Sequence, residues 1–378
     1  MTIVSIVLIL ILILLLLFTG IAGWISSERL LRVSETWYTV TLPVIGATEK
    51  TVTLPRRKET TYAGIYGISW ENNYAILGEI VESSEQTVTR CIIKMTQPLP
   101  VGQPVTWNIF VYTGDPQSAL GLSYEDVRIP SELGLLSAWF IPGERSTWVL
   151  LVHGFHASRE EALRILPALA RIGLPALVLT YRNDTGAPKS PDHFYHLGDT
   201  EWRDIEAGVR YALARGAQDV VLYGWSMGGC MVETFLHRSS EAIHVRAAVL
   251  DSPVLDWHGA LEAQLLNLHF PRWFTYVMKW FVARRSGIDF NALNYTCQAS
   301  ATGIPILLFH GDADSMVPIA GSDLYARARL DQVNYQRISN ADHTQVWNVD
   351  PQAYEDTLIS FLTRASEPEA QRNDKRVE

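Results

Sequence analysis

The first 27 residues carry no charged side chain, and this constrains the chain more than any other feature of the sequence. The run from Ile3 to Phe18 is apolar apart from Ser5. About twenty helical residues at roughly 1.5 Å each span the roughly 30 Å hydrocarbon core of a bilayer. We therefore expect residues 1–27 to form a single-pass transmembrane anchor, which makes the lipid bilayer a partner of the chain.

A cleaved signal peptide is the alternative for this segment. Such a peptide has a basic start, an apolar region of about 7–15 residues and a small-x-small cleavage site. Here the apolar run is longer and no Lys or Arg precedes it, although Gly20-Ile21-Ala22 would serve as a cleavage site, so we favour the retained anchor. Arg29 and Arg32 follow the span, which favours a cytoplasmic body, but Glu28 and Glu35 lie among them. We leave open which side of the membrane holds the body.

Composition excludes several classes of protein for the rest of the chain. Hydrophobic residues make up 48% and charged residues 19%, below the roughly 25% charged residues of an average soluble domain, so the chain can bury a large core. The net charge of −9 argues against a nucleic-acid binder. Three cysteines without a Cys-x-x-Cys pair exclude a disulfide scaffold and a zinc ribbon.

Residues 34–120 are predicted to form a small β-rich domain. Runs rich in Thr, Val, Ile and Tyr are separated there by turn residues, and no helical periodicity interrupts them. We interpret this domain as a packing or spacer module, because it has no recognisable catalytic cluster. The six predicted strands are Thr36–Leu42, Lys50–Leu54, Thr60–Ile68, Tyr74–Val81, Gln86–Lys94 and Pro104–Tyr112.

From residue 121 to residue 364, short apolar strands alternate with helical stretches. This pattern predicts a mostly parallel sheet with helices on both faces, in which ligands bind beyond the carboxyl ends of the strands. The polar residues 365–378 are expected to be a disordered tail. The predicted strands are Trp148–Val152, Ala176–Thr180, Val220–Tyr223, Ala247–Leu250 and Ile304–Phe309, and the predicted helices are Arg159–Ile172, Thr200–Ala214, Met227–Arg238 and Tyr325–Leu330.

Two loops of this region predict a nucleophile and its oxyanion hole. Residues 224–228 read Gly-Trp-Ser-Met-Gly and lie between a predicted strand and a predicted helix. A G-x-S-x-G turn in this position lifts the serine hydroxyl above the edge of the sheet. The loop His153-Gly154-Phe155 follows another strand, where such folds supply a backbone N–H to an oxyanion hole. We expect Ser226 to be the nucleophile, with the N–H groups of Phe155 and Met227 as oxyanion donors.

Two later loops predict the partners of this serine. The loop 310–318 carries Asp312 and Asp314, and either carboxylate would serve to orient a histidine. His343 is the only histidine that lies downstream of both the serine and this loop; it stands between the strand-like Val333–Ile338 and the predicted terminal helix Tyr354–Leu362. The chain order Ser, Asp, His is that of α/β-hydrolases and differs from that of chymotrypsin and subtilisin.

These motifs give the region 121–364 a family resemblance. With HGFHASREEALR, GWSMGG, HGDADSMVP and ADHT, it resembles the α/β-hydrolase superfamily, on the branch of prolyl-oligopeptidase catalytic domains, serine aminopeptidases and lysophospholipase-like hydrolases. The resemblance implies the α/β-hydrolase fold, with Ser226 as nucleophile, Asp314 as the triad acid in preference to Asp312, and His343 as the base. It implies neither a metal nor an organic cofactor. The β-rich region is too short for the propeller of prolyl oligopeptidases, because each blade needs about 40 residues.

Residues 254–303 occupy the place of a hydrolase lid. Nine aromatic residues and four basic residues crowd into this segment, so it either packs onto the sheet, lines an apolar substrate site or touches a membrane surface. The aromatic residues are Trp257, Phe270, Trp273, Phe274, Tyr276, Trp280, Phe281, Phe290 and Tyr295, and the basic ones are Arg272, Lys279, Arg284 and Arg285.

The sequence therefore predicts a membrane-anchored serine hydrolase of the carboxylesterase or lipase kind. Its substrate would be a small, partly apolar acyl compound or peptide with an ester, thioester or amide bond. The first alternative is a serine aminopeptidase or dipeptidyl-type peptidase, and the second is a non-catalytic binding module tethered to the membrane. We also expect the anchor to be independent of the body, so that deleting residues 1–27 leaves a soluble esterase.

Overall fold

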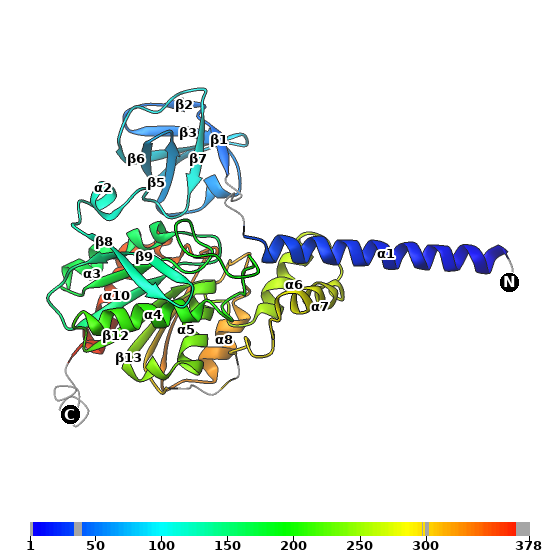
Figure 1. Ribbon diagram of the computed structural model, residues 1–378. Helices are drawn as coiled ribbons and strands as arrows, with labels where there is room; N and C mark the ends of the chain where they lie inside the picture. The colour runs from blue at the N-terminus through cyan, green and yellow to red at the C-terminus, as the bar shows by residue number, and fades with distance from the viewer. Residues whose placement is uncertain (1–2, 34–39, 297, 299–301, 368–378) are drawn as a thin grey trace.

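A computed structural model describes residues 3–33, 40–296, 298 and 302–367. A long helix, α1, projects from a larger α/β body to the right in Figure 1, and a small β domain sits above that body in the same view. Residues 368–378 of the predicted tail 365–378 and the start of the predicted strand Thr36–Leu42 lie outside the described residues, whereas Ala365 is the last residue of the terminal helix.

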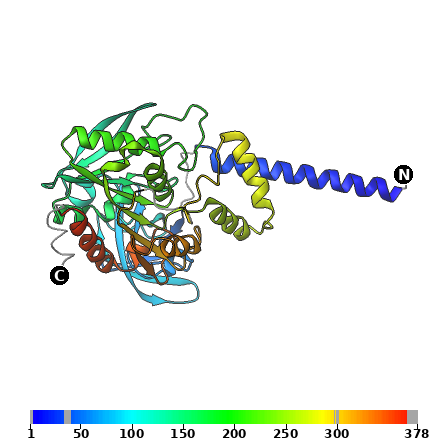
Figure 2. The same cartoon turned by 90° about the horizontal axis from the view of Figure 1, so that it is seen from below.

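Helix α1 runs from Ile3 to Leu31 and is long and apolar enough to cross a membrane. Its last turns pack against the lid, and seen from below the two lid helices lie beside the body end of α1 (Figure 2). A β-carbon at Gly23 would lie 2.7 Å from the ring of Phe281, and Leu31 is fully buried in the core of the body. The expectation of an independent anchor is therefore wrong, because the helix continues past the apolar run and its polar end finds partners on the lid.

The β domain is a seven-stranded antiparallel sheet with its own apolar core, in the order β1-β7-β4-β5-β6-β3-β2. The predicted strand Thr60–Ile68 is wrong in its first half, where Glu59–Thr61 form a 3-10 turn. The Thr60 hydroxyl there donates to the carbonyl of Pro55, a local bond that competes with strand pairing. The strands are β1 (Thr41–Pro43), β2 (Gly46–Ala47), β3 (Thr51–Pro55), β4 (Tyr66–Trp70), β5 (Asn73–Ser83), β6 (Thr87–Met95) and β7 (Pro104–Asn108).

The body contains an eight-stranded sheet in the order β15-β14-β13-β12-β10-β11-β9-β8. The strands from β10 to β15 are parallel, as predicted, and an antiparallel hairpin, β8 and β9, which was not predicted, extends one edge. The strands are β8 (Glu125–Ser131), β9 (Gly134–Ile141), β10 (Thr147–Val152), β11 (Ala176–Leu179), β12 (Asp219–Trp225), β13 (Val245–Asp251), β14 (Ile306–Gly311) and β15 (Val333–Ile338).

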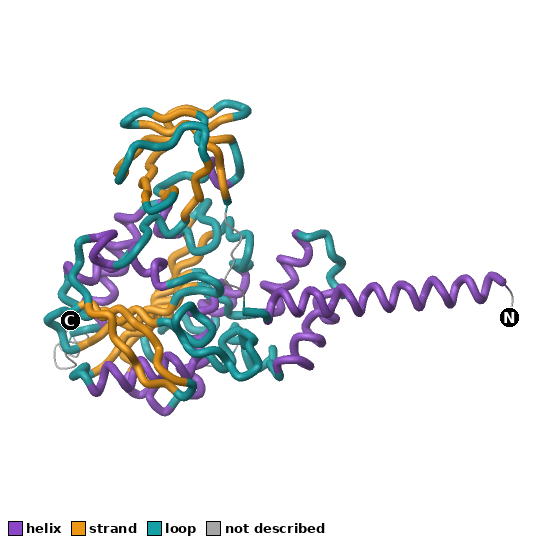
Figure 3. The backbone as a smooth tube through the Cα atoms, turned by 45° about the horizontal axis from the view of Figure 1, so that its top comes forward, coloured by secondary structure: helices purple, strands orange, loops and turns teal. Residues whose placement is uncertain are grey.

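Helices cover both faces of this sheet, because successive side chains of each buried strand enter opposite cores. Leu150 of β10 belongs to the apolar core that also contains residues of α4, α5 and α8, whereas Leu151 belongs to the opposite core, which contains residues of α3 and α10. Figure 3 shows helices on both sides of the strands of the body. The predicted helix Arg159–Ile172 is instead a 3-10 turn (Arg159–Arg164) followed by the short α3, which has a proline in its first turn. The helices are α2 (Pro116–Leu120), α3 (Leu166–Arg171), α4 (Trp202–Ala214), α5 (Met227–Arg238), α6 (Trp257–Asn267), α7 (Phe274–Ser286), α8 (Ala320–Arg327), α9 (Val346–Val349) and α10 (Pro351–Ala365).

The lid consists of α6 and α7 and the segments around them. Four of its predicted aromatic side chains, Trp257, Phe274, Phe290 and Tyr295, are buried and pack it onto the body. Trp273, Tyr276 and Trp280 are instead 54%, 65% and 61% exposed. The lid therefore has a packed side and an exposed aromatic side, next to a helix long enough to span a bilayer.

Candidate active site

Ser226 occupies a sharp turn between β12 and α5. Its backbone has φ 50° and ψ −115°, a conformation that side-chain-bearing residues rarely adopt. The turn is possible because glycines stand on both sides of the serine. A β-carbon at Gly228 would lie 2.2 Å from the carbonyl oxygen of Val152, and one at Gly224 would lie 2.4 Å from the carbonyl oxygen of Gly228. This local geometry holds the Ser226 hydroxyl at the carboxyl end of the sheet.

The structure brings Ser226, His343 and Asp314 into one hydrogen-bonded row. The Nε2 atom of His343 is 2.9 Å from the Ser226 Oγ, and its Nδ1 atom is 2.7 Å from the Asp314 Oδ2. Asp312 lies outside this row, because its side chain is exposed and accepts a 2.7 Å bond from the backbone N–H of Asn340. Of the two aspartates that the sequence offered, Asp314 is the one that contacts the histidine.

The electrostatics of this row favour a charged aspartate beside a basic histidine. Burial by itself would raise the pKa of Asp314, but the positive charge of His343 and hydrogen bonds from His310 and His343 outweigh burial and lower it. Burial would likewise lower the pKa of His343, but the Asp314 charge and hydrogen bond raise it above its ordinary value. His310 is a second, fully buried histidine on the same carboxylate, with its Nε2 atom 3.2 Å from the Asp314 Oδ2.

Backbone N–H groups approach the serine from two sides. Met227 is the first residue of α5, so its N–H has no carbonyl partner within the helix. Gly154 lies against the serine, since a β-carbon there would be 3.1 Å from that of Ser226, and Phe155 follows it in the loop after β10. The predicted oxyanion residues therefore both lie near Ser226: Met227 follows it as the first residue of α5, and Phe155 belongs to the loop that borders it.

Buried side chains fix the loop after β10. The Glu161 Oε2 accepts a 2.8 Å bond from the N–H of Gly154, and Arg164, whose guanidinium lies 3.6 Å from the Glu161 Oε1, donates to the carbonyl of Thr344. His153 contacts Asp184, with 2.9 Å between its Nε2 atom and the carboxylate. The loop that borders the serine is thereby joined to the segment that follows His343.

Comparison with known proteins agrees with this geometry. Residues 192–366 match the model of the prolyl oligopeptidase family. An esterase of Pyrococcus furiosus, Pf2001, is 24% identical over a region that covers 68% of this chain and 96% of that one, with a TM-score of 0.53. Est1E of Butyrivibrio proteoclasticus, solved with ferulic acid, is 18% identical and covers 63% and 98% of the two chains, with a TM-score of 0.51. The chain has the α/β-hydrolase fold. The predicted fold and family resemblance are confirmed.

Two further matches concern parts of this hydrolase. The uncharacterized protein YfhR of Escherichia coli is 24% identical over 268 residues, which are 68% of this chain and 86% of that protein. Residues 43–108, which span most of the β domain of the hydrolase, match a domain of unknown function, DUF8805. The β domain therefore matches a family model separate from the one that matches residues 192–366.

The β domain contacts the hydrolase body at the residue next to His343. The Asp342 Oδ2 accepts a 2.5 Å bond from the hydroxyl of Tyr62 and a 3.0 Å bond from the Lys58 Nζ. Its Oδ1 accepts 2.8 Å bonds from the N–H groups of Ser315 and His343. Asp342 thus joins the β domain to both loops that carry the acid and the histidine.

In the sequence, Asp342 stands out only as part of the motif ADHT, and no pattern marks a role for Glu161 or Arg164. Asp342 and Arg164 act through contacts with segments far away in the chain, so no local pattern marks their partners. Glu161 contacts Gly154, seven residues earlier, but a spacing of seven in a loop is not a recognisable pattern. The one available signal was position, because Asp342 is adjacent to His343 and residues 161 and 164 follow the HGF loop.

Proposed function

We propose that this α/β-hydrolase is a membrane-anchored serine hydrolase that cleaves an acyl ester, thioester or amide. The observation that carries the proposal is the position of His343, whose two ring nitrogens face the Ser226 hydroxyl and the Asp314 carboxylate at 2.9 and 2.7 Å. A nucleophile and base within hydrogen-bond reach, with the base oriented by a third group, is the arrangement that activates a serine.

The proposed mechanism has two half-reactions. His343 takes the proton of Ser226 as the Oγ attacks the acyl carbonyl carbon, and the N–H groups of Phe155 and Met227 stabilise the oxyanion. His343 returns the proton to the leaving alcohol, thiol or amine as its bond to the acyl carbon breaks. Water then attacks the acyl-enzyme in the same way and releases the carboxylic acid. Asp314 holds the imidazole in the required tautomer throughout.

Membrane attachment is the second part of the proposal. The apolar side chains of α1 are exposed from Ile3 to Phe18, where no protein surface covers them in the described part of the chain. A single helix with such a surface is stable in lipid, because its backbone bonds are satisfied internally. The exposed aromatic side chains of the lid, next to the body end of α1, suit the membrane interface.

Labelling with a fluorophosphonate tests the catalytic part. We expect the wild-type hydrolase in detergent to be labelled, because the probe phosphonylates an activated serine, and we expect Ser226→Ala to take no label. In-gel fluorescence measures the difference. Ser131→Ala is the control: Ser131 lies at the end of the edge strand β8, and its hydroxyl donates to the carbonyl of Gly134. A folded wild-type protein without label would favour the non-catalytic binding module.

A peptidase is the second candidate, because the family model that matches residues 192–366 is that of prolyl oligopeptidases. A peptidase that binds a free α-amine needs a carboxylate to pair with its charge. Glu262 is the only carboxylate between Asp256 and Asp289 in the lid, and it lies 4.0 Å from the Arg272 guanidinium, which already pairs with it. We rank the esterase first because the lid offers no other carboxylate in this stretch. Turnover of p-nitrophenyl acyl esters beside aminoacyl-p-nitroanilides separates the two, and faster amide turnover would reverse the ranking.

A further inference from the structure

A cavity of about 390 Å³ lies between the last turns of α1 and the lid. Its size falls within the roughly 300–1,000 Å³ of ligand pockets. The side chains around it are mostly apolar and come from both elements: Ala22, Ile25 and Leu30 from α1, and Leu261, Leu265 and Met278 from the lid. One wall of this cavity is therefore the membrane helix itself.

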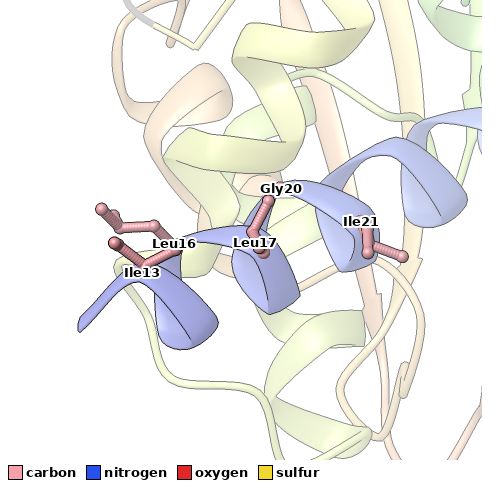
Figure 4. A pocket seen from close by; sticks show the side chains of 5 residues that line it. All are labelled: Ile13, Leu16, Leu17, Gly20 and Ile21. Carbon is pink, nitrogen blue, oxygen red and sulfur yellow. The ribbon is translucent and has the colours of Figure 1, made fainter. Parts of the chain in front are cut away.

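The same cavity reaches the loop that borders the nucleophile. Phe155 is among its lining residues, and Phe155 follows Gly154, whose backbone lies against Ser226. An apolar chain in the cavity would thus point its end toward the candidate oxyanion loop. A second hollow on α1, lined by Ile13, Leu16, Leu17, Gly20 and Ile21, is formed by this helix alone and lies on its exposed apolar surface (Figure 4).

The cavity also lies at the depth of a membrane interface. Twenty residues of helix cross the roughly 30 Å hydrocarbon core, so a span that begins at Ile3 ends near Ala22, the first cavity residue. Two turns later Arg29 lines the cavity with an exposed side chain, which places a cation where a lipid phosphate would lie. Arg285 holds α1 in place, because it donates 2.8 Å to the Ser27 hydroxyl and lies 4.1 Å from the Trp24 ring centre.

We infer that this cavity binds the acyl chain of a glycerophospholipid that enters from the bilayer. The inference rests on the proposed function, since the bond to be cleaved is the lipid's acyl ester at Ser226. Ser226 Oγ bonds to the acyl carbon and the lysolipid alcohol leaves with the proton from His343. Water then releases the fatty acid. In this arrangement α1 supplies part of the substrate site as well as attachment.

Two isoleucines one turn apart on α1 give a matched test. Ile25→Trp fills the cavity, whereas Ile21→Trp makes the same change on the exposed surface of Figure 4. With full-length protein in detergent, we expect Ile25→Trp to lower the ratio of kcat/KM for p-nitrophenyl dodecanoate over p-nitrophenyl acetate at least about tenfold, the effect of misfitting a methylene in an apolar pocket. Ile21→Trp should leave this ratio unchanged. Equal ratios in both variants would overturn the acyl site.

The lipid source is tested with vesicles of phosphatidylglycerol and phosphatidylcholine. The reconstituted wild-type protein should release fatty acid from them, and Ile25→Trp should release less than Ile21→Trp. If the protein cleaved the dodecanoate ester but released no fatty acid from vesicles, a glycerophospholipid would not be its substrate. The proposal that the protein is a serine hydrolase would still stand. Absence of fluorophosphonate labelling in the wild type would instead overturn the proposed function.

An independent observation concerns the β domain. Asp342 is held by Tyr62 and Lys58 of that domain and itself accepts bonds from the backbone of His343 and Ser315. The hydrogen bond from Tyr62 lowers the pKa of the buried Asp342 against the opposing effect of burial. We propose that the β domain is a positioning element, which keeps the histidine loop and the acid loop in register through Asp342.

Removing one hydroxyl tests this role. Tyr62→Phe deletes the bond to Asp342, and Tyr335→Phe deletes a similar 2.9 Å tyrosine–aspartate bond, which joins β15 to Asp323 of α8 and does not touch Asp342. We expect Tyr62→Phe to lower kcat and the rate of fluorophosphonate labelling roughly three- to tenfold, with KM and the final labelled fraction unchanged. Tyr335→Phe should change neither rate. Equal effects of both variants, or an effect of Tyr62→Phe on KM alone, would overturn the positioning role.

Discussion

Replacing Asp314 with asparagine should lower kcat of the hydrolase about 10⁴-fold while the fold survives, because the histidine then loses the carboxylate that fixes its tautomer. The structure supports this size of effect, since the Asp314 carboxylate is buried 2.7 Å from the His343 Nδ1. Ester turnover measures the loss, and circular dichroism checks the fold.

Asp312→Asn is the matched control for this prediction. The Asp312 side chain is exposed and accepts a bond from the backbone N–H of Asn340, away from Ser226. Its replacement should therefore lower kcat less than about threefold, as surface substitutions do. Equal losses in the two variants, or a larger loss in Asp312→Asn, would show that the acid is wrongly assigned.

The pH dependence of kcat/KM gives a second readout. His343 must be neutral to accept the serine proton, so activity falls as the pH drops through its pKa. Asp314 raises that pKa, and removing its charge should lower it. The residual activity of Asp314→Asn should therefore persist to a lower pH than the activity of the wild type.

The second large effect is expected at Gly228, in the turn after Ser226. A β-carbon there would lie 2.2 Å from the Val152 carbonyl oxygen and 2.8 Å from that of His153, and neither backbone atom can move without displacing the end of β10. Gly228→Ala should therefore lower the free energy of unfolding by about 3 kcal/mol or more. Urea unfolding measures the change, and the fluorophosphonate labelling rate should fall with it.

Gly321→Ala provides the comparison. Gly321 lies in α8, and a β-carbon there would meet only a side-chain methyl group at 3.7 Å. The substitution should be neutral or stabilise the protein by up to about 1 kcal/mol, because alanine favours the helix. If Gly228→Ala changed the free energy of unfolding as little as Gly321→Ala, the close contact between α5 and β10 would not be the reason that the turn requires glycine.

The sequence by itself determined the parts of this protein that local chemistry specifies. Buried parallel strands are continuous apolar runs, so β10, β12 and β13 were visible without a structure. The glycines around Ser226 permit one kind of turn, so the strand–serine–helix unit was visible as well. The apolar start of the chain predicted a helix of membrane length, because the number of consecutive apolar residues sets the length of the span.

Only the tertiary structure decided which distant segments meet. Asp312 and Asp314 are equivalent by composition, and the fold separates them by turning one carboxylate toward His343 and the other to solvent. The packing of α1 on the lid and the bond from Tyr62 to Asp342 join residues about 250 and 280 positions apart. Such contacts leave no periodic trace in a sequence, because each depends on side chains that come together only after the elements have packed.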